Sequence, residues 1–562
     1  MLRRGRRWRT GGGACLLGLV GTGVGCSGDS AGPTLPPCTA AGDSVVLAVG
    51  EYVSLDPIPD SGCAVFAANA DPSTAEYLIV PQSAAGEPGR KSSFSLRGDT
   101  IVFPAPVAPA LASEPEQSPA EQFHDRLRRA EATRDYGPAL PPDGGQARRV
   151  PGAAAPIGPP RAKPLVGEQR TFSVLAELDL SRFQTVTATA WAVGQHIAIF
   201  IDNAAPANGL SGENLDSLRS VFDSRLYGAD TAAFGRESDI TGDSVVIVLM
   251  TPLVNQLVSK AECAQSGFIA GFFFGADIDP AFANDSRFNH TEIFYTLVAD
   301  PFATVSCAHS ALQVARLVPV TLIHEFQHMI SYNQHVLVRG GDTEVLWLNE
   351  GLSHLAEELG GRTYAPGTPE YSRFIIGDLF NAYQFLDSTF RHFLLPTEGI
   401  GKLPERGAAW LFVRYLVDQY GAATTRALLE TNQTGAANVA AVTGDFTQTV
   451  TRWALANWVS DLNVVGFTPP PELRYTSWSF RTTYASLHAQ DPATFAKPFP
   501  LVPTVGVGDA VNLRGTLRAG SGQYHRVLQN PGDGGFTLVF GTGTGGPLPA
   551  MVVPRLNVIR IR

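Results

Sequence analysis

The 562-residue sequence predicts an α+β protein in which a central domain of mixed sheet and helices is flanked by small β-sandwich-like domains. Three observations lead to this fold class. Short β-type runs separated by Gly, Pro, Asp and Ser lie near both ends of the chain. Strand and helix patterns mix from residue 166 onward. After residue 370 the apolar residues recur mainly at helical spacing, which predicts a helical C-terminal half for the central domain.

Composition divides the chain into regions. These are an N-terminal β domain at 34–105, a Pro/Ala-rich linker at 106–165, the central domain at 166–465 and a C-terminal β domain at 466–562. One helix is expected inside the linker, at Pro119–Arg134. Because such a linker cannot bury enough apolar surface to fold alone, we expect the N-terminal β domain to be separable. The alternative is that residues 34–165 act as an inhibitory pro-region.

The first 26 residues have the layout of a secretory signal. Arg3–Arg9 are mostly basic, and a short apolar run follows at Ala14–Gly25. Cys26, preceded by small residues, is similar to a bacterial lipoprotein processing site, although Gly23 stands where such sites usually carry Leu. We expect an exported protein, either lipid-anchored through Cys26 to a membrane surface of the cell envelope or secreted after ordinary cleavage.

Four of the six cysteines lie beyond the signal region, an even number in an oxidising compartment. Pairing of nearest neighbours predicts the disulfides Cys38–Cys63 and Cys263–Cys307.

The overall charge argues against one class of partner. A net charge of −10 and a pI of about 5.6 leave no basic stripe to follow phosphates, so nucleic acid is excluded as a partner. We expect a monomer. Asp239 and Asp243, on either side of Gly242, can supply oxygen ligands for Ca²⁺, but a plain Asp/Gly turn is the favoured explanation.

The most specific motif lies in Thr321–Ile330, which contains His324-Glu325-x-x-His328. Residues four apart lie on one face of a helix, so both imidazoles can point at one metal ion. Glu325 can face the same cleft and act as a general base.

A second segment, Trp347–Ser353, supplies a carboxylate. Glu350 follows His328 with 21 residues between them. Two histidines, one glutamate and an open fourth position make a catalytic zinc site rather than a structural one. His354 is a rival third ligand, which would give a three-histidine site. Otherwise His354 and Glu357 are expected to hydrogen-bond the outer nitrogen of a ligand histidine, or simply to lie on a solvated helix face.

These two segments carry a family resemblance. Trp347–Glu357 resembles the third-ligand helix of the gluzincin metallopeptidases, and together with His324–Ile330 it is most similar to the hyicolysin-type secreted bacterial metallopeptidases. The resemblance covers roughly Arg170 to Leu462 and implies a zincin-type peptidase fold for residues 166–465. The spacing between the motifs is a few residues longer than in the best-known gluzincins, and the extra length falls in Gln334–Glu344, which is expected to be a loop.

The resemblance implies an activity and a role for each motif residue. It implies one Zn²⁺ per chain, a protein or peptide substrate and Glu325 as the base; the zinc ligands would be His324, His328 and Glu350. Thr291–Val298 is expected to be the strand beside the active-site cleft. Tyr383 and Tyr415 are candidates to polarise the scissile carbonyl, but for each a core tyrosine is the stronger interpretation.

Two other functions stay open. One is a catalytically idle surface binding protein that retains the fold, and the other is a zinc hydrolase that acts on a non-peptide bond. The presence of a general base beside the ligands argues against the first, because a binding module has no use for it.

Overall fold

The computed structural model describes residue 38 and residues 44–59, 61–99, 117–136, 160–397 and 399–562. It is a mixed α+β structure with three sheets and a helical C-terminal half of the central region. The signal-like segment and Cys26 lie outside the described residues. Among the helices in these ranges, none is both long and apolar enough to cross a bilayer.

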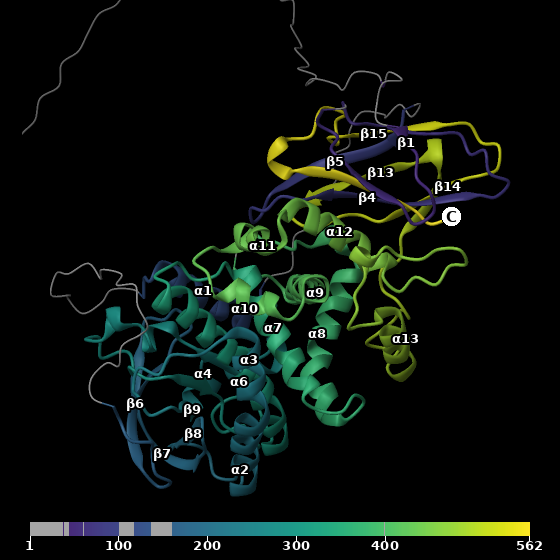
Figure 1. Cartoon of the computed structure of the whole chain (residues 1–562). Coiled ribbons are helices and arrows are strands. Elements are labelled where there is room, and N and C mark those ends of the chain that lie inside the picture. The colour runs from purple at the N-terminus through teal and green to yellow at the C-terminus, as the bar shows by residue number, and fades with distance from the viewer. Residues whose placement is uncertain (1–37, 39–43, 60, 100–116, 137–159, 398) are drawn as a thin grey trace, which may run out of the picture.

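Strands from the two ends of the chain build one sandwich together, as the interleaved purple and yellow strands of Figure 1 show. One sheet has the order β1 (Ser44–Val45), β3 (Cys63–Phe66), β15 (Phe536–Gly541), β5 (Lys91–Gly98) and β13 (Asn512–Arg518). The other has the order β12 (Thr504–Val507), β14 (His525–Gln529), β4 (Ala75–Ser83), β16 (Pro554–Arg560) and β2 (Tyr52–Leu55). The prediction of two separate β domains is therefore wrong.

Strand β4 explains why the two ends must combine. All nine of its residues are buried, so it needs a hydrogen-bonded neighbour on each side, and β14 and β16 supply these. Tyr77 and Ile79 pack inside the sandwich, whereas Leu78 and Val80 belong to the large core that includes the helices. The alternation of side chains along a strand thus fastens the sandwich to the helical half. Tyr524 strengthens this junction by donating to Ala454 O in α12, at 2.6 Å.

We predict that a chain shortened to begin at Leu165 fails to fold stably. It lacks β1 to β5, which leaves buried strand edges unpaired and apolar residues of the sandwich core exposed. Circular dichroism melts and size-exclusion chromatography should show aggregation or loss of cooperative unfolding. A chain that begins at Cys38 keeps every strand and is the control. Cooperative unfolding of both chains at the same temperature would contradict the shared sandwich.

A six-stranded sheet forms the first half of the central region. Its order is β10 (Gly271–Phe273), β11 (Ile293–Thr296), β9 (Val246–Met250), β8 (Ile197–Asp202), β7 (Phe183–Val193) and β6 (Gln169–Leu175). The predicted cleft strand, Thr291–Val298, contains β11, which lies one strand in from the edge. The edge strand is β10, which runs antiparallel to β11. With only three residues, β10 is too short to give a periodic sequence signal.

Helices cover this sheet and form the second half, below the sandwich in Figure 1. Those before the motif helix are α1 (Pro119–Thr133), α2 (Gly212–Val221), α3 (Tyr227–Phe234), α4 (Pro252–Gln256) and α5 (Lys260–Ser266). The rest are α6 (Ala311–Tyr332), α7 (Leu346–Arg362), α8 (Pro369–Asp387), α9 (Leu403–Tyr420), α10 (Ala423–Leu429), α11 (Gly435–Thr443), α12 (Phe446–Val459) and α13 (Phe480–Gln490). The predicted loop at Gln334–Glu344 is only partly a loop, because a π-helical turn at Asn333–Val338 extends α6.

Glycines allow α7 to approach its neighbours closely. A Cβ on Gly351 would lie 2.8 Å from Ala409 O in α9, and one on Gly360 would lie 2.8 Å from Ile323 Cδ1 in α6. Helix α7 is thereby held close against the motif helix.

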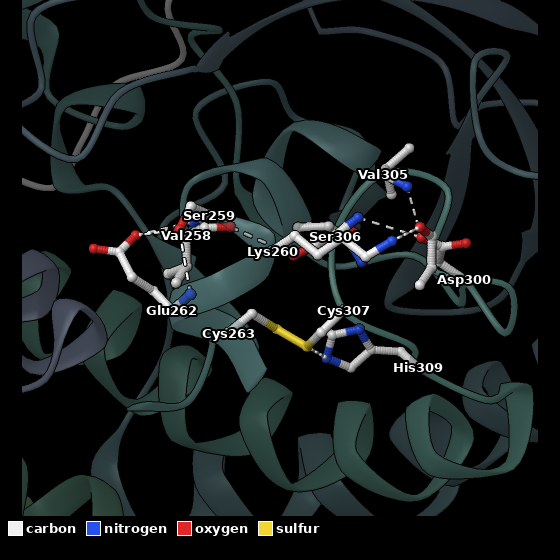
Figure 2. The surroundings of a disulfide bond; sticks show 12 residues. Val258, Ser259, Lys260, Glu262, Cys263, Asp300, Val305, Ser306, Cys307 and His309 are labelled. Carbon is white, nitrogen blue, oxygen red and sulfur yellow. Dashed lines mark hydrogen bonds between the residues drawn. A yellow bond between two sulfur atoms is a disulfide. The ribbon is translucent and has the colours of Figure 1, made fainter. Parts of the chain in front are cut away.

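Both predicted disulfides are present, joining Cys38 to Cys63 and Cys263 to Cys307. Figure 2 shows the second bond, which ties α5 to the segment that leads into α6. His309 Nε2 lies 4.0 Å from Cys307 Sγ, so these three side chains resemble a metal-binding group. Because oxidised sulfurs are not thiolates, this group is explained by the disulfide and not by a metal.

Candidate metal centre

Helix α6 carries the motif, and its sequence explains why the helix forms. The Ser310 hydroxyl accepts from Gln313 N–H while the Gln313 side chain accepts from Ser310 N–H, a reciprocal cap at the N-terminus. Val318, Leu322 and Phe326 are buried on one face at helical spacing. The motif lies in the second half of this helix, which packs against β10 and β11 of the sheet and against α3, α7 and α8.

The structure brings together the predicted ligands. The ring centroids of His324 and His328 are 4.9 Å apart. Glu350, in the second turn of α7, places one carboxylate oxygen near each ring. Its Oε2 lies 3.6 Å from His324 Nε2, and its Oε1 lies 3.3 Å from His328 Nε2. His324, Glu325 and His328 form one of the groups among the described residues that can hold a metal ion.

The outer nitrogen of His324 has the partner expected of a metal ligand. Glu357 Oε1 lies 2.7 Å from His324 Nδ1, which makes Nδ1 the protonated nitrogen and directs the Nε2 lone pair toward Glu350. The position predicted for Glu357, behind a ligand histidine, is the one that the structure shows.

His354 lies behind the ligands as well. Its Nδ1 is 3.0 Å from Glu357 and 2.9 Å from Asp378 in α8. Burial alone would lower the pKa of His354, but the two carboxylates outweigh burial and raise it to about 10. An imidazolium has no lone pair to give a metal. A second group that can hold a metal ion is nevertheless formed by His324, His354 and Glu357. Experiment can therefore compare Glu350 and His354 as candidates for the third ligand.

Asp378 is not among the residues that the sequence predicted for the site. It is buried on a helix face that it shares with Phe374 and Leu379. An acidic residue on an otherwise apolar face needs a partner. That contrast is the signal by which it could have been found.

Charge in the ligand group favours metal binding. Burial, followed by the charge of Arg128, lowers the pKa of His328 to about 3, so the ring is neutral. Burial would raise the pKa of Glu350, but its hydrogen bond with His328 and the nearby cationic groups hold it well below the usual range. A neutral imidazole and an ionised carboxylate are the forms that coordinate a metal.

Glu325 lies beside the two histidines and contacts the edge of the sheet. It is 2% exposed, and its Oε2 accepts from the backbone N–H of Phe273 in β10 at 2.9 Å. The same oxygen accepts from Arg128 Nη2 at 2.6 Å. Burial raises the pKa of Glu325, and the charge of Arg128 opposes that rise. The general-base candidate is therefore placed between the ligands and strand β10.

Arg128 is the second residue that sequence analysis missed, because it belongs to helix α1 in the predicted linker. The helix spans Pro119–Thr133, within the predicted Pro119–Arg134, but several of its side chains are buried, so it is not a free linker. Asp125, Arg128 and Glu131 are all buried, at three-residue intervals along one face. That buried polar row is a sequence signal for a helix with charged partners elsewhere.

Other predicted site residues lie elsewhere in structural roles. Tyr383 Oη accepts from Lys497 N–H at 2.7 Å, and Tyr415 Oη donates to Glu472 O at 2.7 Å. Asp239 accepts from Ser244 N–H and Asp243 from Val245 N–H, so their carboxylates close a turn. The plain turn that the sequence favoured explains both residues, and among the described residues neither belongs to a group of three side chains that can hold a metal ion.

No protein-family model matches this chain, and no curated protein matches it. The geometry of the site, and the resemblance of its two motifs, therefore carry the functional argument.

Proposed function

We propose that this chain is an exported zinc-dependent metallopeptidase of the gluzincin type. One observation supports it above the others. A single carboxylate, Glu350, lies 3.6 and 3.3 Å from the Nε2 atoms of two histidines on one helix face, beside a buried glutamate against the sheet edge. The signal-like segment and Cys26 support export, with lipid anchoring or simple secretion as the two outcomes.

The donor set fits zinc. Two imidazole nitrogens and one carboxylate oxygen are the ligands of a catalytic site that keeps its fourth position open. Glu357 orients His324 from behind, as carboxylates commonly do for zinc-bound histidines. A zinc ion held there would lower the pKa of a bound water to about 7 and stabilise the oxyanion.

The chain's own residues would handle the proton and the substrate. Glu325 lies next to the ligands, where its carboxylate can take a proton from the attacking water and deliver it to the leaving amine. Among the described strands, β10 pairs only with β11, so its other edge would offer backbone groups to an extended peptide once side chains leave it.

Competing functions explain less of this arrangement. An idle binding protein needs neither a buried general base nor a carboxylate behind a ligand histidine. A zinc hydrolase of a non-peptide substrate fits the ligands equally well, but it gives no reason for a sheet edge beside the base.

We predict one zinc per purified chain and casein hydrolysis that depends on it. Elemental analysis gives the zinc content, and casein digestion is followed with and without 1,10-phenanthroline. The chelator should abolish hydrolysis, and added Zn²⁺ should restore it, because the nucleophilic water needs the metal. Hydrolysis that persists in metal-free protein would contradict a metallopeptidase. Cleavage of ester substrates alone would favour the non-peptide hydrolase.

A further inference from the structure

We propose that helix α1 is a built-in plug that occupies the substrate-binding edge and the general base, and so holds the enzyme latent until α1 is displaced. This inference rests on the proposed function, because the site that α1 fills is the proposed peptidase site. Under this proposal helix α1, which lies within the predicted linker, has a regulatory role.

The central contact of the plug is made by Arg128. Its side chain is only 2% exposed, with Nη2 2.6 Å from Glu325 Oε2 and Nη1 3.3 Å from the carbonyl oxygen of Phe273. One guanidinium thus engages both the base and the backbone of the edge strand. A peptide substrate would need the Phe273 carbonyl, and the attacking water would need Glu325.

Glu131 extends this contact by one turn. It accepts from Gly275 N–H at 2.6 Å, just beyond β10, and pairs with Arg128 Nη1 at 2.8 Å. Phe123, earlier in α1, packs edge-to-face on Phe272 with ring centroids 5.1 Å apart. Helix α1 therefore contacts Phe272 and Phe273 of β10 and the Gly275 N–H just beyond it.

Two further contacts tie α1 to both halves of the central region. In the middle of α1, Asp125 Oδ1 accepts from Ile400 N–H at 2.5 Å, on the segment that leads into α9 in the helical half. At the C-terminal end of α1, Arg134 pairs with Asp279, on the sheet side. The plug thus bridges the two halves between which a substrate would have to enter.

Tyr136, just after α1, anchors the plug on the sheet side. It is buried among Phe274, Phe282 and Phe288, with ring centroids 4.9–5.5 Å apart.

The chemistry of the contact suits a reversible plug. A buried ion pair compensates a large desolvation cost only while both partners are in place. Glu325 Oε2 would lose its Arg128 partner on release but keep the Phe273 N–H, so the base would stay positioned. The competing explanation is that Arg128 is a positioning residue that helps Glu325 during catalysis. The two explanations predict opposite changes in rate.

Full-length Arg128→Ala is the direct test, with Arg126→Ala as the matched control. Arg126 lies on the same helix, carries the same charge and is exposed, and its guanidinium donates to Leu178 O, away from Glu325 and β10. The plug predicts that Arg128→Ala raises kcat/KM on a casein-derived peptide by about tenfold or more, because a larger fraction of molecules is open. Arg126→Ala should match the wild-type value. A fall in kcat/KM, or no change, at full zinc occupancy would overturn the plug.

A second measurement covers the case in which Arg128→Ala does not fold. Cleavage sites for a sequence-specific protease are inserted in the full-length chain between β5 and α1 and between α1 and β6. Cutting both should raise kcat/KM, and adding back a synthetic peptide of residues 117–136 should lower it again. The Arg128→Ala peptide should inhibit about tenfold more weakly. Equal inhibition by the two peptides would overturn the plug.

Failure of the plug can be told from failure of the proposed function. Binding of the labelled 117–136 peptide to the cut protein is followed by fluorescence anisotropy, which needs no activity. Binding that weakens with Arg128→Ala supports the plug at this groove, even if no peptide bond is ever cleaved. Hydrolysis that is present but unchanged by cutting overturns the plug and leaves the peptidase standing.

Discussion

Glu325→Gln is expected to keep one zinc per chain and to lower peptide hydrolysis by about 10² to 10⁴-fold. Glutamine has the shape of glutamate, and its side-chain oxygen can still accept from Phe273 N–H. It cannot take a proton from water, so the general-base step is lost while ligation by the histidines is kept. Because the amide carries no charge, it also weakens the pairing with Arg128, which makes α1 easier to displace.

The comparison needs zinc content and rate from the same samples. Glu213→Gln makes the same chemical change at an exposed position of α2 and should leave both quantities unchanged. Rates are compared with α1 in the same state, intact or cut, because release of the plug would otherwise mask part of the loss. A zinc-loaded Glu325→Gln protein that kept most of its activity would remove Glu325 from the role of base.

The motif helix could be predicted because its geometry is local. His324 and His328 share a helix face whatever the rest of the chain does, because they are four residues apart. Glu325 is the next residue after His324, so it lies beside that face. The contact of Glu357 with His324 was also predicted, because a Glu350 ligand requires α7 to pack against α6, and Glu357 lies two turns further along α7. These parts of the site depend on short-range pattern and on one helix–helix contact.

The sandwich could not be predicted from local pattern. Each terminal region has credible strands, but nothing in either one says that Tyr77 pairs with Arg560 across most of the chain. A fully buried strand such as β4 contains no alternation that would reveal which face meets which partner. The correct strands were therefore assigned to two domains instead of one.

The position of α1 escaped prediction for the same reason. The helix has a clear start at Ser118 and Pro119, but the contact that matters joins residues 197 positions apart. Composition made its surroundings resemble a linker. Only the row of Asp125, Arg128 and Glu131, too polar for a buried face without partners, pointed to a docked helix.

Glu350→Ala is expected to weaken zinc binding by more than about 100-fold, and His354→Ala by about 10 to 100-fold. Glu350 lies against both Nε2 atoms and is held ionised, as a ligand must be. His354 is paired with Asp378 and Glu357, and the Glu357 carboxylate also orients His324. Loss of His354 would leave the three donors in place and disturb only the orientation of one.

Competition with a chelating dye gives both zinc affinities on one scale, and circular dichroism checks that each variant is folded. Glu357→Gln is the informative companion, because it keeps a hydrogen-bonding oxygen near His324 Nδ1 but removes one of the two charges that raise the pKa of His354. It should weaken zinc binding to about the same degree as His354→Ala, because each change alters the groups that orient His324 and leaves the three donor atoms in place. If His354→Ala instead lost zinc more completely than Glu350→Ala, His354 would have to be a ligand. The site would then be a three-histidine centre, and the gluzincin proposal would fall with that result.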